Sequence, residues 1–197
     1  GILEQHGITT GAYLSPHLTS FAERVEIDGL PVEPDVFAAA VERVARAAEK
    51  VERTASADER VTQFELLTAA AFTIFADAEV EVAAVEAGLG GRWDATNVLD
   101  AEVVVLTNVG LEHTRWLGPT IGHIAREKLA VVGEGATLVL GPVDDEVRAL
   151  AGDSGAHVVE VADGMDIPSL PSFQRLNFAV AAAAADAVLA ATPFTRD

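Results

Sequence analysis

Short apolar runs alternate with helical segments along most of the chain, and this alternation constrains the fold more than any other feature. The runs have the length and β-branched content of strands, and the segments between them carry apolar residues at helical spacing. Strands are expected at 8–14, 80–86, 103–107, 137–140 and 157–161, and helices at about 34–51, 62–77, 120–132, 144–151 and 176–191. The pattern predicts an α/β fold, with a mostly parallel sheet and helices on both faces.

Length and charge limit the classes of function. The 197 residues, 50% of them hydrophobic, can bury a sizeable core and are most simply one domain. A net charge of −18, without a basic patch, argues against nucleic acid and anionic membrane surfaces as partners. No apolar stretch is long and uniform enough to span a bilayer, and residues 1–7 are no signal peptide, so a cytoplasmic protein is expected. The absence of cysteine excludes disulfides and thiolate metal sites.

Chemically reactive side chains gather in three segments, at residues 85–97, 107–114 and 125–128. Each follows an apolar run and carries carboxylate, imidazole or amine groups. Because ligands bind at the carboxyl ends of strands in open α/β sheets, the three segments are expected to converge on one crevice. Lys128 stands out, since the only other lysine is Lys50. The pattern indicates an active site.

Together with three further stretches, these segments resemble the central ATPase domain of the folylpolyglutamate synthase and dihydrofolate synthase family, within the Mur ligase superfamily. The matching stretches, in the family's order, are Ser15–Leu18 with Phe21, Glu23–Val25 and Asp28–Gly29, then Thr62–Glu65, Glu86–Asn97, Gly110–Thr114 with Trp116–Gly118, Ile124–Lys128, and a weaker Gln174–Asn177. The resemblance implies a fold like that of P-loop NTPases. It makes residues 1–191 the ATPase domain and residues 192–197 the start of a linker to a C-terminal glutamate-binding domain.

Enzymes of this family join the carboxylate of a folate or dihydropteroate to the amine of L-glutamate. They use ATP to form an acyl phosphate, which the amine then displaces. The resemblance implies the same ligation here, in folate biosynthesis and one-carbon metabolism, by a protein expected to be a monomer. Since ATP and the carboxylate are both anionic, two Mg²⁺ ions with hard oxygen ligands are expected.

The resemblance implies three catalytic, metal-binding residues. Glu86 would hold the first Mg²⁺, together with a hydroxyl of the phosphate-binding loop, and His113 would hold the second. Lys128 corresponds to the lysine that the family carbamoylates with carbon dioxide, which turns a repelled ammonium group into an anionic ligand. An isolated lysine after Glu127 would instead be a helix-surface residue, but the neighbouring motifs favour the ligand.

Further residues are assigned to substrates by the resemblance. Thr62, Phe64, Asp94 and Ala95 would border the pterin ring, with Phe64 stacking and Asp94 bonding its nitrogens. His17 would position substrate or phosphate. Gln174 and Asn177 would contact adenine.

Simpler structural interpretations exist for the same residues. The Thr-x-x-Glu spacing of Thr62 and Glu65 predicts a helix capping box, whatever else Thr62 does. Phe64 could be a core residue, His17 a solvated loop residue, and Asn177 a helix cap. The glycines of the 85–97 segment most simply allow a tight loop.

The chain also departs from the family pattern. The Gly-Lys-Ser or Gly-Lys-Thr loop that cradles phosphates is nowhere in it, and residue 1 would lie just beyond that loop. The chain alone is therefore expected to have little or no ligase activity. Glu112 replaces the usual aspartate, and Phe173 replaces a usual histidine. The segment from Val161 to Phe173 is short for the family, which is consistent with a deletion near residues 163–172.

Three hypotheses follow from the sequence. The favoured one is that the chain is part of an intact ligase acting on folates. The second is a degenerate relative that binds a pterin or nucleotide without turnover. The third is another Mur-superfamily ligase, such as a peptidoglycan-precursor enzyme, although Thr62–Glu65 and Asp94–Asn97 fit the folate branch better.

Overall fold

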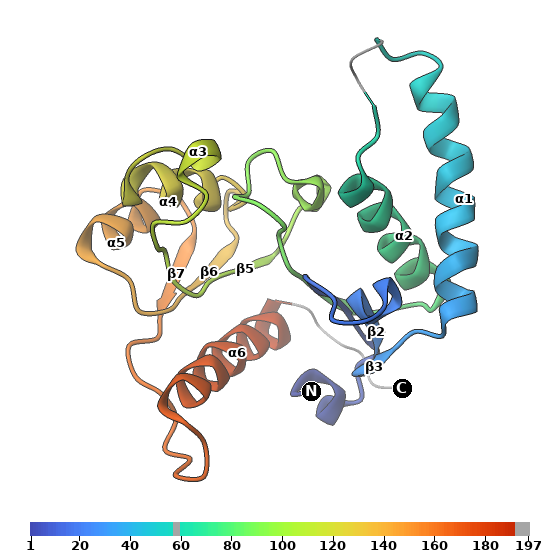
Figure 1. Ribbon diagram of the computed structural model, residues 1–197. Coiled ribbons are helices and arrows are strands. Elements are labelled where there is room, and N and C mark those ends of the chain that lie inside the picture. The colour runs from blue at the N-terminus through green and yellow to red at the C-terminus, as the bar shows by residue number, and fades with distance from the viewer. Residues whose placement is uncertain (57–59, 192–197) are drawn as a thin grey trace. The chain divides into compact units, whose positions relative to one another are not determined.

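The computed structural model describes residues 1–56 and 60–191, which form two compact units (Figure 1). The first unit ends at Gly88 and the second begins at Leu89. The linker expected at 192–197 lies outside the described residues. Within the described ranges, no helix is both long and apolar enough to cross a membrane.

The first unit contains a four-stranded mixed sheet in the order β3-β2-β1-β4. The strands are β1 (Thr10–Tyr13), β2 (Val25–Ile27), β3 (Leu30–Pro31) and β4 (Val82–Val85), and the helices are α1 (Pro34–Glu52) and α2 (Gln63–Asp77), with short 3-10 helices η1 (Leu3–His6) and η2 (Phe21–Arg24). Strand β1 pairs in parallel with β4, whereas β2 is antiparallel to both of its neighbours. The register places Tyr13 opposite Val85, so the residues after β1 and β4 leave the sheet at the same edge.

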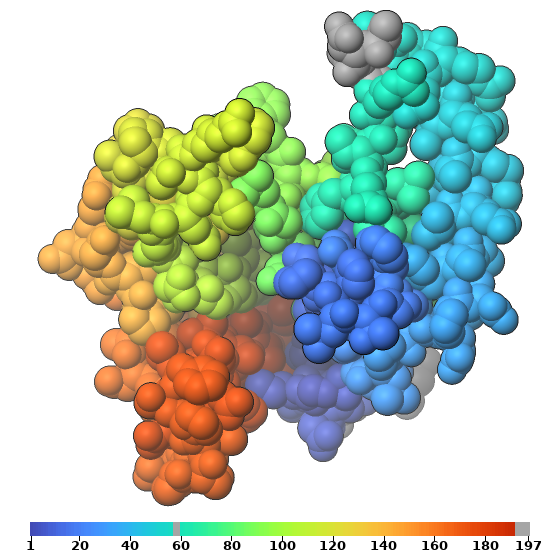
Figure 2. Space-filling view, viewed as in Figure 1, coloured from blue at the N-terminus to red at the C-terminus, as the bar shows by residue number. Residues whose placement is uncertain are grey.

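Local sequence explains the two long helices of this unit. Pro34 occupies the first turn of α1, where its fixed φ is favourable and its missing N–H costs nothing. Most α1 side chains are exposed, and they form a continuous band in Figure 2, coloured light blue to cyan. The more apolar α2 buries residues along its length. The shared core consists of Tyr13, Val25, Ala40, Leu67, Ala70, Ala71, Ile74 and Phe75.

The second unit contains a parallel sheet in the order β5-β6-β7. Its strands are β5 (Val103–Leu106), β6 (Thr137–Leu140) and β7 (His157–Glu160), and its helices are α3 (Thr114–Leu117), α4 (Ile121–Leu129), α5 (Asp145–Gly152) and α6 (Ser172–Ala191), with the 3-10 helix η3 (Ala95–Val98). Within this unit, α4 and α5 lie on one side of the sheet and α6 on the other (Figure 1). The core consists of Leu106, Ala125, Leu129, Leu138, Leu140, Val147 and Ala151.

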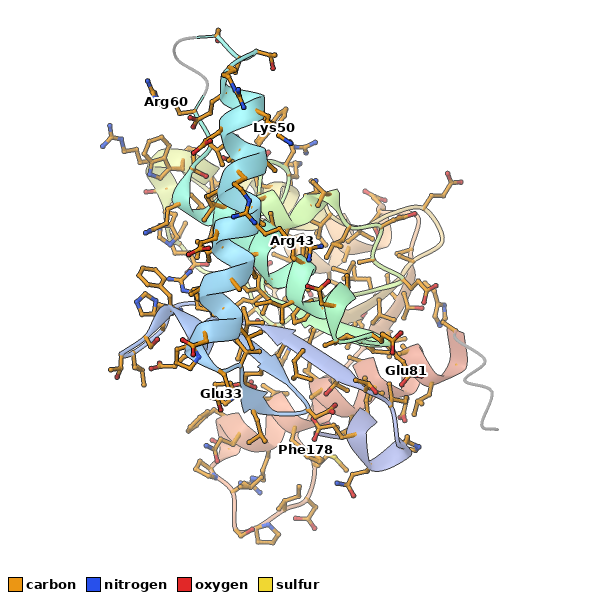
Figure 3. The ribbon with its side chains drawn as sticks, turned by 90° about the vertical axis from the view of Figure 1, so that its right-hand side faces the viewer. Glu33, Arg43, Lys50, Arg60, Glu81 and Phe178 are labelled. Atoms are coloured by element: carbon orange, nitrogen blue, oxygen red, sulfur yellow. The ribbon has the colours of Figure 1, made fainter. Side chains whose placement is uncertain are left out.

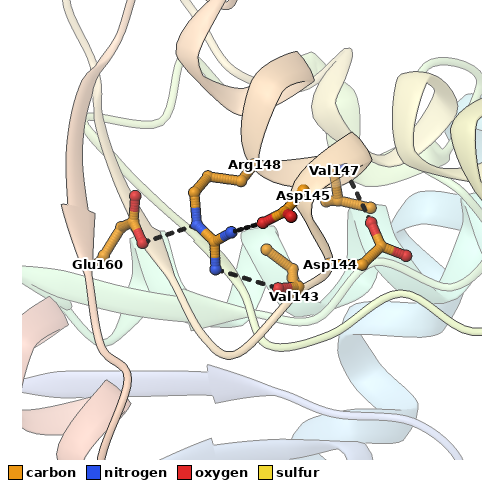
Figure 4. A network of polar contacts seen from close by, with 6 residues as sticks. All are labelled: Val143, Asp144, Asp145, Val147, Arg148 and Glu160. Carbon is orange, nitrogen blue, oxygen red and sulfur yellow. Dashed lines mark hydrogen bonds and ion pairs between the residues drawn. The ribbon is translucent and has the colours of Figure 1, made fainter.

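Arg148 ties α5 to the neighbouring strand β7 (Figure 4). Its Nε donates to Oε2 of Glu160 at 3.0 Å, and a second guanidinium nitrogen donates to the carbonyl oxygen of Val143 at 3.2 Å. The hydrogen bond and charge of Glu160, followed by those of Asp145, raise the pKa of the Arg148 guanidinium. Asp144 caps the same helix, because its carboxylate accepts from the amide of Val147 at 3.0 Å.

Parallel pairing of β1 with β4, and of β5, β6 and β7, confirms the predicted α/β class. Two short elements were not predicted, the β2–β3 hairpin and helix α3. The hairpin closes at Asp28 and Gly29, which both have positive φ, 47° and 73°.

Candidate active site

Glu86 directly follows β4, at the edge where β1 also ends. Its backbone N–H donates to the carbonyl oxygen of Tyr13 at 2.9 Å, which continues the parallel ladder by one step. The amide of Ser15 donates to Oε2 of the Glu86 carboxylate at 2.6 Å, and the Ser15 hydroxyl lies 3.4 Å from the same oxygen. Among the described residues, none donates a hydrogen bond to the other carboxylate oxygen, Oε1, and Glu86 is exposed. Glu86 therefore presents a positioned, anionic oxygen.

His17 lies three residues beyond Leu14, in the loop that joins β1 to η2. Its imidazole is half-buried and stacks at a tilt on the ring of Phe21, with the ring centroids 4.2 Å apart. Nε of Arg24 donates to Nδ1 of His17 at 3.0 Å. The structure thus places His17 in a fixed position, and its role toward substrate stays a prediction.

The predicted capping box at the start of α2 is confirmed. The Thr62 hydroxyl accepts from the amide of Glu65 at 3.2 Å, and the Glu65 carboxylate accepts from the amide of Thr62 at 2.7 Å. These hydrogen bonds, the backbone one first, lower the pKa of the Glu65 carboxyl. The Thr62 hydroxyl also donates to Glu65, so both of its hydrogen-bonding roles already serve the helix.

Phe64 lies between the first unit's core and the glycine-rich loop. Its ring is 5.9 Å from that of Tyr13, centroid to centroid, and it packs against the core cluster. A Cβ at Gly88 would come within 2.6 Å of Cζ of Phe64, so only glycine allows this approach. Phe64 is therefore partly a core residue, and its proposed stacking on a pterin is untested.

In the second unit, Lys128 forms an ion pair with Glu112, the residue that precedes His113. Lys128 belongs to the last turn of α4, and its Nζ lies 3.0 Å from Oε1 of Glu112. The hydrogen bond and charge of Lys128 lower the pKa of the Glu112 carboxyl. Only 22% of the Lys128 side chain is exposed, so this is no freely solvated surface lysine.

His113 has an uncommon backbone conformation for a residue with a side chain. Its φ of 50° and ψ of 32° are left-handed, and it immediately precedes α3. Its carbonyl oxygen accepts from the amides of Trp116 and Leu117 at 2.8 and 3.0 Å, which begins that helix. Left-handed residues of this kind concentrate at functional sites, since their conformational cost must be offset by surrounding structure. The imidazole is exposed.

The carboxylate of Asp94 stabilises its own loop. Oδ1 accepts from the amide and hydroxyl of Thr96, at 3.0 and 2.6 Å, and Oδ2 accepts from the amide of Leu89 at 2.8 Å. Ala95 follows as the first residue of η3. Both carboxylate oxygens are thus engaged within the loop, which was not predicted from the sequence.

The same loop packs on the end of α4. The amide of Arg92 donates to the Glu127 carbonyl oxygen at 3.1 Å, and its Nε donates to the Glu127 carboxylate at 3.0 Å. A Cβ at Gly91 would lie 2.7 Å from the Glu127 carbonyl oxygen and 2.9 Å from that of Lys128. The loop around Asp94 therefore supports the backbone that carries Lys128.

We expect Asp94→Ala to lower the free energy of unfolding by about 1 kcal/mol, the usual effect of removing a capping carboxylate or hydroxyl. Asp94→Asn, which keeps an acceptor oxygen, should lose less. Urea unfolding of the two variants provides the measurement. Weakened pterin binding with unchanged stability would instead mean that Asp94 acts on the ligand alone.

Gln174 and Asn177 both lie in the first turns of α6, which begins at Ser172, earlier than predicted. They are three positions apart, so they share one face of the helix, and both are exposed. Asn177 lies inside the helix and is not its cap, which corrects that alternative interpretation. A role in binding adenine is compatible with this placement and untested.

The predicted residues are divided between the two units. Lys128, the Glu112–His113 pair and the Asp94 loop belong together in the second unit, whereas Glu86, His17, Thr62 and Phe64 belong to the first. Convergence of all three reactive segments therefore stays a prediction. Among residues 1–56 and 60–191, no group of three or more His, Cys, Asp or Glu side chains could hold a metal ion.

Four supporting partners were missed by the sequence reasoning: Ser15 at Glu86, Arg24 at His17, Arg92 at Glu127, and Glu112 at Lys128. Each of these partners lies inside one of the stretches that resemble the family, so its place in the motif could have marked it as a candidate. Their pairings, however, join residues up to 71 positions apart, and local patterns do not reveal them.

Comparison with known proteins identifies relatives over much of the chain. The dihydrofolate synthase/folylpolyglutamate synthase of Mycobacterium tuberculosis is 42% identical over 128 residues, covering 62% of this chain and 26% of that protein. The folylpolyglutamate synthase of Lacticaseibacillus casei is 41% identical over 151 residues, covering 76% of this chain and 35% of that protein. A solved FPGS-AMPPCP-folate complex matches with a TM-score of 0.89 at 30% identity, covering 100% of this chain and 55% of the other.

These relatives are considerably longer than the chain. It spans 26% and 35% of the two curated proteins. No protein-family model matches it.

Proposed function

The chain belongs to the folylpolyglutamate synthase family, and on that premise we propose that residues 1–191 are the central ATPase domain of an ATP-dependent amide ligase. The ligase would join L-glutamate to the carboxylate of a folate or dihydropteroate, and would act as a monomer. The sequence match to the Lacticaseibacillus casei enzyme carries this proposal. A continuous match over 76% of the chain must include its middle, and with it Glu86, His113 and Lys128.

The proposed reaction has two steps. The substrate carboxylate attacks the γ-phosphorus of ATP, which forms an acyl phosphate and releases ADP. The amine of L-glutamate then attacks the acyl carbon, loses a proton, and expels inorganic phosphate as the amide forms. Both steps bring anionic groups together, so the protein must supply or hold positive charge.

Bound Mg²⁺ would neutralise the phosphate charge during the first step. The residues present fit a role in holding it. Glu86 offers an exposed carboxylate oxygen that is orientated by the Ser15 amide, and hard anionic oxygens are what Mg²⁺ prefers. His113 is exposed on a strained backbone beside a carboxylate, which is compatible with its proposed part in the second site.

Lys128 fits the proposed set only after carbamoylation. As an ammonium group paired with Glu112, it cannot coordinate a cation. The neutral amine can attack carbon dioxide through its nitrogen lone pair and release one proton, which leaves an anionic carbamate. Beside the Glu112 carboxylate, this second anion would be repelled unless a cation lies near both. Carbamoylation and Mg²⁺ binding are therefore proposed to depend on each other.

We assign the pterin to Thr62, Phe64, Asp94 and Ala95, as the family resemblance implies. Phe64 offers an aromatic ring that is only partly used by the core. Asp94 is proposed to act chiefly through the loop that it stabilises, because both of its oxygens are engaged there. Gln174 and Asn177 are assigned to adenine.

The test uses the full-length protein, meaning this chain with whatever residues its gene encodes on either side. We expect ATP-dependent addition of L-glutamate to dihydropteroate or tetrahydrofolate, detected as a glutamylated product by mass spectrometry. Binding of a pterin or nucleotide without product would favour the degenerate relative. Ligation of a nucleotide-linked muropeptide, with neither folate accepted, would refute the folate assignment.

A further inference from the structure

In the loop that joins β1 to η2, residues 14–20, one carboxylate holds three consecutive backbone amides. Glu23 accepts from three consecutive amides, those of Leu18 at 3.0 Å, Thr19 at 3.2 Å and Ser20 at 2.8 Å. These hydrogen bonds, the one from Leu18 first, lower the pKa of the Glu23 carboxyl. The loop is therefore held by charge-assisted bonds although it lies at the surface.

His17 is the one side chain of this loop that is clamped on two sides. Its ring stacks on Phe21, and its Nδ1 faces Nε of Arg24 at 3.0 Å. The Arg24 guanidinium lies over Phe21 as well, 5.8 Å from the ring centroid. Among the described residues, no hydrogen bond is recorded to Nε2 of His17, and the imidazole is half-exposed.

The Arg24 contact determines which nitrogen of His17 carries the hydrogen. A guanidinium group has only donors and remains charged at all ordinary pH values, so Nδ1 must be the acceptor. In a neutral imidazole with Nδ1 accepting, the hydrogen is on Nε2. A hydrogen on Nδ1 would point at the Arg24 N–H and would remove this bond.

We propose that Arg24 is a positioning residue that fixes His17 as the neutral Nε2–H tautomer, so that His17 donates a hydrogen bond to an anionic oxygen of bound substrate. The oxygen would belong either to a phosphate of ATP or to a carboxylate of the folate. This inference rests on the proposed ligase function. It assigns His17 the role of a fixed donor, and excludes it as a general base or a metal ligand through Nδ1.

The position of the loop supports an anionic partner. The loop starts beside Glu86, since the Ser15 amide donates to the Glu86 carboxylate at 2.6 Å. His17 is therefore two residues from Ser15, whose amide bonds the carboxylate proposed to hold Mg²⁺, and the anionic groups of the reaction are expected near that carboxylate. A neutral donor suits this place, because it stabilises anionic oxygen without repelling the metal ion.

The tautomer can be read directly by NMR of the full-length protein labelled with ¹⁵N in histidine. His17→Gln identifies the His17 signals among those of the other histidines. We expect the Nε2–H pattern in the wild type at neutral pH. Arg43→Ala is the matched control, because Arg43 is another arginine of the first unit, on α1, and this variant should show the same pattern (Figure 3). Arg24→Ala should give a mixture of tautomers, and Arg24→Gln, which retains an N–H donor, should recover part of the original pattern. A Nδ1–H or doubly protonated His17 in the wild type would overturn the proposal.

The donor role has a separate kinetic test. His17→Gln and Arg24→Ala should each raise one KM by about tenfold, the order expected for losing a hydrogen bond to a charged group, with a smaller change in kcat. A higher KM for ATP would show that His17 donates to a phosphate oxygen. A higher KM for the folate would show that it donates to the carboxylate. Unchanged KM values in active variants would overturn the donor role. The NMR measurement needs no turnover. It therefore tests the tautomer of His17 even if the protein proves not to be a folate ligase.

Discussion

Lys128→Ala in the full-length protein should lower glutamate ligation by about 100-fold or more. Loss of even an outer partner of a metal ligand costs about 10- to 100-fold, and Lys128 is proposed to become a ligand itself. Only 22% of its side chain is exposed, and its amine is paired with Glu112 at 3.0 Å. Removing it leaves the Glu112 carboxylate without its cation and the proposed metal site without one anion. The measurement is the rate of glutamylated product at saturating ATP.

Two further results separate this role from a loss of folding. A small carboxylate such as acetate should restore part of the activity of Lys128→Ala, because it can supply the missing anionic oxygen. Lys50→Ala is the matched control, since Lys50 is a second lysine that lies exposed near the end of α1 (Figure 3). Full activity in Lys128→Ala would refute the proposed role of this residue.

Gly91→Ala is expected to lower the free energy of unfolding by about 1 to 3 kcal/mol, the range for forcing extra atoms into packed structure. The added Cβ would lie 2.7 Å from the carbonyl oxygen of Glu127 and 2.9 Å from that of Lys128. These are backbone atoms near the end of α4, and they cannot rotate away as a flexible side chain can. Relief would require the loop or the end of α4 to move, which would also displace Lys128.

The control for this substitution is Gly152→Ala. Gly152 ends α5, and an added Cβ there meets nothing within 4 Å. Alanine is the better helix former, so this variant should be as stable as the wild type or slightly more stable. Urea unfolding compares the two variants. Equal stability of both would show that the loop does not pack on α4 as described.

The sequence predicted those elements of the structure that depend on residues close together in the chain. The Thr-x-x-Glu spacing predicted the capping box that begins α2, and α1 begins at residue 34 as its apolar spacing predicted. The β6 strand was predicted with its observed bounds, Thr137–Leu140. The three- and two-residue strands β2 and β3 were too short for a periodic pattern to reveal. Helix α6 begins directly after Pro171, whose restricted backbone is a better start signal than the apolar stripe.

The candidate site was predictable in its motifs and much less so in its contacts. Glu86 was expected as the last residue of a strand at 80–86, and it directly follows the observed strand, which ends at Val85. The hydrogen bond between Ser15 and Glu86 exists because β1 pairs in parallel with β4. The sequence alone does not specify that these two strands are neighbours. Similarly, Asp94 was assigned to the pterin because the family motif places it there. Its bonds to Leu89 and Thr96 depend on the folded shape of the loop.

The most direct test of the account is a crystal structure of the full-length protein with an ATP analogue and Mn²⁺ in place of Mg²⁺. We predict one anomalous peak bound by Glu86, and a second bound by His113 and a carbamoylated Lys128. Metal ions whose ligands exclude these three side chains, or an unmodified Lys128 still paired with Glu112 when the metal is bound, would contradict the account.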